Sequence, residues 1–361
     1  MIHFFIGTKA QLIKTAPVMV ELQRRNIVFR YVDSGQHGNF TQSLRKIFRI
    51  KEPDFSFCKD NRDITNSIDA FKWVGYLLVC YFFKRKNLRD KVFAGGGICL
   101  IHGDTLSTLF GLMLAKAAKL KVGHIEAGLR SFNYLHPFPE EIIRIYCMKK
   151  CDFLFAPSDM SYNNLKSMRL KGKIIKVDGN TVVDALRFIH KNYVNIEIPK
   201  EPYALATCHR LETITNRNRL EKVIQLINCV SKKIKVVFVV HKPTRKYLKQ
   251  FALMEKISSN VEIIEMQNYV EFTALIRNSK MVLADGGSIQ EECAYLCKPC
   301  LILRNKTERP DGLGNNAMLW NFDYAVLDSF INNIDSITYL IDEWPKPSVK
   351  IADFLVHQMN S

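Results

Sequence analysis

The sequence repeats one pattern in both halves: a short apolar run, a cluster of glycine and polar residues, and a longer stretch with helical character. In the first half the predicted strands are Ile2–Ile6, Ile27–Val32, Ile98–Ile101, Val122–Ile125 and Phe153–Ala156. In the second half they are Tyr203–Thr207, Val236–Val240, Val261–Ile264, Met281–Ala284 and Cys300–Leu303. Strands that alternate with helices form parallel sheets covered on both faces. The pattern therefore predicts an α/β chain of two doubly wound halves.

The length is consistent with two domains, since 361 residues exceed twice the usual domain size of about 150. We place the boundary near residues 176–179, which gives a first domain of residues 1–177 and a second of 178–347. The last segment, 348–361, follows Pro345 and Pro347 and is predicted to be a helix that returns to the first domain.

The chain is strongly basic, with a formal net charge of +17. A hydrophobic fraction of 47% excludes a largely disordered chain. The charge suits a membrane surface, a nucleic acid or a phosphorylated small molecule. The sequence carries no nucleic-acid-binding signature, so we expect no nucleic-acid partner.

The ten cysteines are dispersed, and only Cys293, Cys297 and Cys300 form a tight group. No second pair stands at zinc-finger spacing, so we expect buried thiols and no metal. The N-terminus has neither a basic region nor a cleavage site, which predicts that no signal peptide is present. Free thiols fit a reducing compartment, and we expect a cytoplasmic protein.

The most apolar stretch is Phe71–Phe83, followed by Lys84, Arg85 and Lys86. It is too short to span a bilayer. A buried helix with a basic cap explains it, and a weak peripheral membrane contact through residues 71–86 is the alternative.

Glycine-rich and polar clusters directly follow several predicted strands. They are Gly7–Lys9, Gly35–His37, His102–Thr105, Glu126–Gly128, Cys208–Arg210 and Asp285–Ser288. Ligands of parallel sheets bind at the carboxyl ends of strands, so we expect one cleft between the halves.

Two kinds of chemistry are suggested by these clusters. The strand-to-helix turn at Asp285–Ser288 would offer backbone N–H groups to a phosphate, although a plain turn explains it equally well. Acid–base candidates are Asp104, Glu126, Glu140, Glu141 and His209. Helix capping and a satisfied loop histidine are the alternatives for these residues.

Several motifs in this order resemble one family. They are GTKAQLIKTAP (7–17), SGQH (34–37), HGDTLSTL (102–109), GHIEAGLRSFN (123–133), PFPEEIIR (137–144), GNTVVDAL (179–186), CHRLET (208–213), DGGSIQEE (285–292) and TERPDGLG (307–314). The chain resembles the non-hydrolysing UDP-N-acetylglucosamine 2-epimerases over nearly its whole length.

The resemblance implies two Rossmann-like domains facing one cleft, as in glycosyltransferases of the B type, and a homodimer. It also implies inversion at C2 of a UDP-linked 2-acetamido sugar by elimination and re-addition of UDP, for surface polysaccharide synthesis, with no cofactor. The residues that match catalytic positions are Asp104, Glu126, Glu140 and His209. Those that match UDP or phosphate contacts are Lys9, Lys14, Arg210, Phe272, Gly286, Gly287, Ser288 and Glu292. Gln36 and His241 match part of a regulatory sugar-nucleotide site.

The chain departs from the family pattern at three places. The first loop has Lys9-Ala10-Gln11 where arginine-proline-glutamate is usual, Cys208 replaces a glycine, and the order within Asp285–Ser288 is permuted. LRSFN (129–133) and HKPTRK (241–246) also resemble epimerases that act on diacetamido sugars. The alternatives are a glycosyltransferase with a UDP-sugar donor and a membrane-linked acceptor, a hydrolysing epimerase, and a UDP-sugar sensor without turnover.

Overall fold

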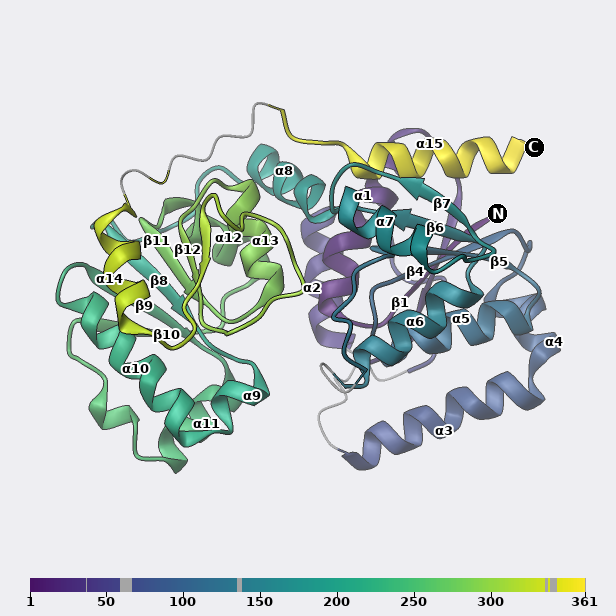
Figure 1. The fold of residues 1–361 in the computed structure, drawn as a ribbon. Coiled ribbons are helices and arrows are strands. Elements are labelled where there is room, and N and C mark those ends of the chain that lie inside the picture. The colour runs from purple at the N-terminus through teal and green to yellow at the C-terminus, as the bar shows by residue number, and fades with distance from the viewer. Residues whose placement is uncertain (37, 59–66, 135–137, 335–336, 338–342, 361) are drawn as a thin grey trace. The chain divides into compact units, whose positions relative to one another are not determined.

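The computed structural model describes residues 1–36, 38–58, 67–134, 138–334, 337 and 343–360. The chain divides into two compact units, Met1–Phe188 with Pro345–Ser361, and Ile189–Trp344. Each unit contains one fully parallel sheet with helices packed on it (Figure 1). The predicted α/β fold with two doubly wound sheets is confirmed. The division between the units falls within α8 (Val182–Asn192), later than the sequence-based domain boundary at 177/178.

The first unit has a seven-stranded sheet in the order β3-β2-β1-β4-β5-β6-β7. Its strands are β1 (Ile2–Ile6), β2 (Phe29–Asp33), β3 (Phe55–Ser56), β4 (Ile98–His102), β5 (Lys121–Ile125), β6 (Phe153–Ala156) and β7 (Lys173–Lys176). Its helices, besides α8, are α1 (Lys9–Arg24), α2 (Gly38–Phe48), α3 (Ser67–Phe83), α4 (Arg85–Asn87), α5 (Leu106–Ala117), α6 (Glu140–Lys150), α7 (Asp159–Ser167) and α15 (Pro347–Asn360), with a short turn at Leu88–Val92.

The second unit has a six-stranded sheet in the order β10-β9-β8-β11-β12-β13. Its strands are β8 (Tyr203–Thr207), β9 (Lys235–Val240), β10 (Val261–Glu265), β11 (Met281–Ala284), β12 (Cys300–Ile302) and β13 (Ala317–Leu319). Its helices are α9 (Leu211–Ile214), α10 (Arg217–Ser231), α11 (Lys242–Gln250), α12 (Tyr269–Asn278), α13 (Gly287–Tyr295) and α14 (Tyr324–Asn332), with a short turn at Met254–Lys256.

Apolar residues fill both faces of the central strands. Along β8, Ala204 and Ala206 lie in one hydrophobic cluster, whereas Tyr203 and Leu205 lie in the other. Successive side chains of a strand point to opposite faces, so a strand that is apolar throughout is buried on both sides. This explains why the central strands read as continuous apolar runs.

The start of α1 is fastened to the carboxyl end of β4. Thr8 caps the helix, because its side chain accepts from the Gln11 N–H while the Gln11 side chain accepts from the Thr8 N–H. The Gln11 amide nitrogen also donates to the His102 carbonyl oxygen at 2.8 Å and to Thr108 Oγ1 at 2.9 Å. A glutamate, which is usual in the family motif, has no N–H to donate there.

Helix α15 packs on the first unit (Figure 1). The Phe354 ring lies edge-on to Phe153 and Phe155 of β6, with centroids 5.0 and 5.5 Å away. Arg25 Nη1 binds Asp353 Oδ1 at 2.5 Å. These contacts attach the last helix to both the sheet and the end of α1.

Helix α3 carries the most apolar sequence of the chain and has two unlike faces. Trp73, Leu77 and Cys80 are buried in the core of the first unit, whereas Phe71 and Phe83 are exposed. The expectation of a buried helix therefore holds for one face alone. Among the described residues, no helix combines the length and the apolar character needed to cross a membrane.

Candidate functional site

Glu126 directly follows β5 at the carboxyl edge of the first sheet, in left-handed backbone with a φ of 65°. Its Oε2 is 2.7 Å from Lys14 Nζ and 2.9 Å from His102 Nε2. All three side chains are almost fully buried. The lysine charge offsets the cost of burying the carboxylate. Other non-glycine residues, such as Asn26 and Lys119, share this backbone, so it is the buried ion pair that marks this position.

Lys14 was predicted to contact a phosphate. In the structure its ammonium lies on the Glu126 carboxylate inside the first unit. The side chain is 3% exposed. Lys14 thus neutralises the charge of Glu126 and holds its carboxylate in place.

Asp104 is the first residue of a chain of ion pairs that reaches α6. Its Oδ2 binds Arg144 Nη2, and Arg144 Nη1 binds Glu141 Oε2 at 2.7 Å. Glu141 also accepts from Arg130 Nε at 2.5 Å and from the Ser131 N–H. Burial raises the pKa of the Glu141 carboxyl, but the hydrogen bonds from Arg130 and Ser131 outweigh it and hold that pKa below the usual value. Glu141 is therefore engaged in structural bonds.

Glu140 begins α6 and differs from its neighbour Glu141. In the described part of the chain, the buried Oε2 of Glu140 has no hydrogen-bond partner. Glu140 lies one turn before Arg144 and on the same helix face. Arg144 therefore binds Asp104 and lies on the helix face that also carries Glu140.

The loops after β1, β2 and β4 meet at the same edge. Ser107 Oγ, in the first turn of α5, donates to Gln36 Oε1 at 2.7 Å and lies 2.8 Å from Ser34 Oγ. A Cβ on Gly7 would come within 2.0 Å of Ser34 Oγ, so a side chain does not fit there. Lys9, half-buried, begins α1 beside this contact. His37 lies outside the described residues.

In the second unit, Asp285 joins two loops that the sequence treated as separate motifs. It follows β11 and is fully buried. Its carboxylate accepts from the backbone N–H groups of His209 and Arg210, each at about 3.0 Å, and from the Cys208 thiol at 3.2 Å. Its Oδ1 is 3.3 Å from His209 Nδ1. Burial, with the nearby Asp285 carboxylate, raises the pKa of the Cys208 thiol well above its usual value, so this thiol acts as a donor.

The His209 ring lies between a second histidine and the turn after β11. It stacks on the His241 ring with centroids 4.8 Å apart and planes 22° apart. A Cβ on Gly286 would lie 2.9 Å from His209 Cε1. The glycine therefore lets the imidazole sit against the start of α13.

Helix α13 begins at Gly287, with Gly286 as its N-cap and Ser288 in its first turn. No side chain caps it among the described residues. The first N–H groups of a helix form a binding site for anions. Gly286, Gly287 and Ser288 thus place backbone donors beside His209, as the sequence predicted for a phosphate turn.

The sequence that forms most of this site matches one family model. The model for UDP-N-acetylglucosamine 2-epimerase matches residues 94–329, which is more than half of the chain. The chain belongs to the UDP-N-acetylglucosamine 2-epimerase family. The predicted enzyme class, an isomerase, is confirmed with it.

Relatives in the family are similar along most of their length. The UDP-N-acetylglucosamine 2-epimerase of Methanocaldococcus jannaschii is 33% identical over 86% of this chain and 85% of its own. That of Neisseria meningitidis is 31% identical over 96% of this chain and 92% of its own. The crystal structure of the Neisseria enzyme, bound to UDP-GlcNAc, has a TM-score of 0.82, 28% identity and 99% coverage of both chains.

Two further comparisons concern the fold. The Methanocaldococcus enzyme in complex with UDP-GlcNAc and UDP has a TM-score of 0.80 at 27% identity, with 99% of both chains covered. A glycosyltransferase of kitacinnamycin has a TM-score of 0.51 at 11% identity, with 99% of this chain and 98% of its own covered, and shares the fold alone. The predicted likeness to B-type glycosyltransferases is confirmed at the level of architecture.

The family turn at α13 is stabilised by residues that the sequence analysis missed. Gln290 Nε2 donates to the carbonyl oxygens of Arg309 and Asp311, and Arg309 Nη1 binds Glu291 Oε2 at 2.9 Å. The motif TERPDGLG (307–314) was recognised, but only the fold shows that it closes over α13. The only signal in the sequence was that this motif follows DGGSIQEE (285–292) within about 15 residues.

Three predicted nucleotide contacts lie in this region with different exposure. Glu292, also on α13, is 4% exposed and lies beside Tyr269. Burial and the Glu292 carboxylate raise the pKa of the Tyr269 hydroxyl well above its usual value. Phe272 of α12 is half-buried against the core. Arg210 is partly exposed, with Nη2 3.7 Å from Glu308 Oε1.

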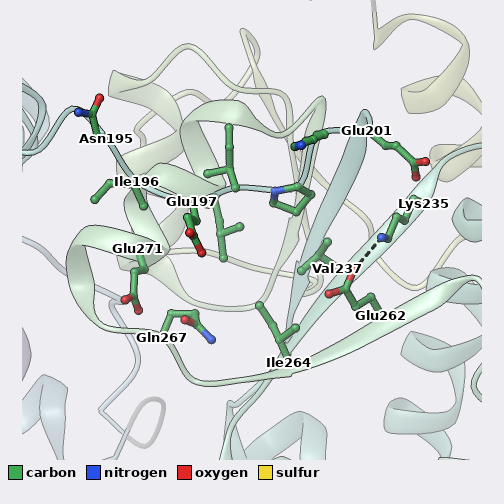
Figure 2. Close-up of a pocket in the computed structure, with 14 residues that line it drawn as sticks. Asn195, Ile196, Glu197, Glu201, Lys235, Val237, Glu262, Ile264, Gln267 and Glu271 are labelled. Carbon is green, nitrogen blue, oxygen red and sulfur yellow. Dashed lines mark ion pairs between the residues drawn. The ribbon is translucent and has the colours of Figure 1, made fainter.

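One hollow in the second unit, ≈ 860 Å³, contains none of the predicted site residues. It lies along residues 195–201 and the outer strands β9 and β10 (Figure 2). Lys235 and Glu262, at the amino ends of these strands, form an ion pair of 2.8 Å there. Ligands of parallel sheets bind at the opposite, carboxyl end, where the family motifs lie.

All ten cysteines are free, and seven of them are buried. Among the described residues, no group of three or more His, Cys, Asp or Glu side chains is arranged to hold a metal ion.

Proposed function

We propose that this family member inverts C2 of a UDP-linked 2-acetamido sugar, UDP-N-acetylglucosamine or a diacetamido analogue, without hydrolysing it. A base takes the proton from C2 while the C1–O bond to UDP breaks, which gives a 2-acetamidoglucal and UDP. A proton is then delivered to the other face of C2 while a UDP phosphate oxygen attacks C1. Elimination and re-addition of UDP need no cofactor, because the proton and UDP that leave are the groups that return. The epimeric product would supply surface polysaccharide synthesis.

The observation that carries the proposal is Glu126, a buried carboxylate in left-handed backbone between Lys14 and His102. Removing an unactivated C2 proton needs a positioned group, and this one is fixed by two partners and by its backbone. Asp104 and Glu140 are the other carboxylates we assign to proton transfer. We leave base and acid unassigned among them, because coupled carboxylates share protons.

The departing UDP needs donors that receive negative charge. We assign this task to the N–H groups of Gly286, Gly287 and Ser288 and to the imidazole of His209. Lys9 and Arg210 would add positive charge. Phe272 would pack on the uracil ring, and Glu292 would accept from a ribose hydroxyl.

Gln36 and His241 remain candidates for a regulatory sugar-nucleotide contact. We also propose that the protein is a homodimer and that the two units are its domains. Light scattering tests the oligomeric state.

Proton NMR of the protein with UDP-N-acetylglucosamine in deuterium oxide tests the function. A second UDP-sugar should appear, and the C2 proton signal should disappear from both epimers. Glu126→Gln and Asp104→Asn should abolish the exchange, and the exposed Glu262→Gln should leave it unchanged. If neither this sugar nor a diacetamido analogue exchanges, the proposal is wrong. Transfer to a lipid-linked acceptor, or release of free N-acetylmannosamine, would favour a glycosyltransferase or a hydrolysing epimerase.

A further inference from the structure

Helix α3 presents an apolar face to solvent, which we call the α3 face. It is made of the exposed side chains of Ile68, Phe71, Tyr76, Val79, Phe82 and Phe83. At 3.6 residues per turn these side chains fall within a sector of about 140° around the helix axis, so they lie on one side of the helix. Phe71 is 78% and Phe83 is 82% exposed, whereas Leu77 on the opposite side is fully buried.

A helix that is apolar on all sides is normally covered on all sides. Soluble monomers rarely expose a contiguous apolar surface as large as six bulky side chains along one helix. Gly75, in the middle of the α3 face, has no neighbouring atom within 4 Å of the position of its absent Cβ. The described residues of the first unit leave this face open, so it is suited to an external partner.

Basic residues lie within the α3 face and follow its carboxyl end. Between positions 67 and 91 the chain has six basic and two acidic residues, a net charge of +4. The basic residues are Lys72, Lys84, Arg85, Lys86, Arg89 and Lys91, all exposed. Lys84 Nζ lies 5.1 Å from the centre of the Tyr76 ring, so at least this cation is held against the apolar side chains.

We propose that the α3 face docks on the surface of a lipid bilayer that carries anionic headgroups. Aromatic and aliphatic side chains would enter the boundary between headgroups and acyl chains, and the basic residues would contact the phosphates. The charge argues for this partner over a second copy of the chain, since two copies joined through this face would bring two patches of +4 together. The helix would lie on the membrane without crossing it.

The proposal is independent of the epimerase reaction. It is tested by flotation of the full chain with vesicles of phosphatidylcholine alone and with added phosphatidylglycerol. The protein should float with the anionic vesicles only, and salt should weaken the binding.

Two double variants separate the two contributions. Lys84→Glu with Lys86→Glu should weaken binding by more than about thirtyfold, because each basic residue near an anionic surface contributes about 1 kcal/mol and each new carboxylate is repelled by that surface. Phe71→Ser with Phe83→Ser should remove binding without changing the fold, since both rings are exposed. The matched controls in other parts of the chain are Lys232→Glu with Lys233→Glu and Val28→Ser with Val194→Ser, all at exposed positions.

Three outcomes overturn the proposal. The wild-type chain fails to float with anionic vesicles, or the controls lose as much binding as the α3 variants. In the third outcome, the wild-type chain does not float and light scattering shows that Phe71→Ser with Phe83→Ser turns a dimer into monomers. The α3 face would then be a contact between two copies of the chain.

Discussion

The carboxylate of Asp285 lies 3.3 Å from Nδ1 of His209 and also accepts that residue's own backbone N–H. One buried side chain therefore sets the position of the loop after β8 and places a negative charge beside its imidazole. A carboxylate at Nδ1 favours the tautomer that carries the proton there, which directs Nε2 away from Asp285.

Asp285→Asn should reduce kcat/KM of the epimerase about tenfold to a hundredfold, because an amide removes the charge beside Nδ1 and is a weaker acceptor for the two backbone donors. Steady-state kinetics with the NMR assay measure the change. Cys208→Ser is the matched control: a hydroxyl keeps the donor to Asp285, so we expect activity near that of the wild type. Equal losses in both variants would contradict a positioning role for Asp285.

Lys14 and Glu126 form a buried ion pair in the proposed site. Lys14→Met leaves the Glu126 carboxylate buried without its cation, and we expect a loss of about 3 kcal/mol in the free energy of unfolding. The double variant Lys14→Met with Glu126→Gln removes both charges and should recover part of that loss. Urea unfolding of the single and double variants measures the coupling between them. If the losses of unfolding free energy in the two single variants add up to the loss in the double variant, Lys14 and Glu126 have no stabilising interaction with each other.

Much of this arrangement could be predicted from the sequence. Ile2–Ile6, Phe153–Ala156, Tyr203–Thr207 and Met281–Ala284 were predicted with their observed bounds, because apolar runs between turn residues fix buried strands. Three strands, β3, β7 and β13, were missed. β3 has only two residues, Phe55 and Ser56, which form no recognisable apolar run. β13 is short and partly exposed, and β7 (Lys173–Lys176) begins and ends with exposed lysines, so neither reads as an apolar run.

The contacts within the site were less predictable. The sequence placed Asp285 in a turn but gave no sign that it reaches Cys208, His209 and Arg210, about 75 residues earlier, since parallel pairing of β8 and β11 brings the two loops together. Lys14 was predicted as a phosphate contact, from its charge and from its match to the family's first loop. Its partner Glu126 became visible only in the structure, where α1 and β5 belong to one unit.

Gln11 explains one departure from the family motif through its hydrogen bonds. Gln11→Glu would bring a carboxylate oxygen against the His102 carbonyl oxygen, where the amide now donates at 2.8 Å. The site is 1% exposed, so we expect a loss of about 2 kcal/mol in the free energy of unfolding. Denaturant unfolding measures it.

The control for this change is Gln36→Glu. Gln36 Oε1 accepts a hydrogen bond from Ser107 Oγ, a role that a carboxylate keeps, so the free energy of unfolding should change by less than about 0.5 kcal/mol. If the two variants lose equal stability, added charge and not the lost donor is responsible.

His124, on β5, makes stability depend on pH. Burial lowers its pKa from 6.5 to about 4, even though its Nε2 is 2.7 Å from the Gly103 carbonyl oxygen. The unfolded chain therefore takes up a proton at higher pH than the folded chain does. The stability from neutral His124 is complete above pH 6.5 and is lost as the pH falls toward 4, by up to about 3 kcal/mol.

His124→Asn keeps an N–H donor for the Gly103 carbonyl oxygen but does not titrate. We expect urea unfolding between pH 6.5 and pH 4 to show a shallower loss of stability in this variant than in the wild type. Burial also lowers the pKa values of His3 and His190 to about 4. These two histidines should therefore cause the same remaining loss of stability with falling pH in both proteins. Parallel curves for the two proteins would mean that the buried imidazole is already protonated in the folded state or that the folded chain opens before it titrates.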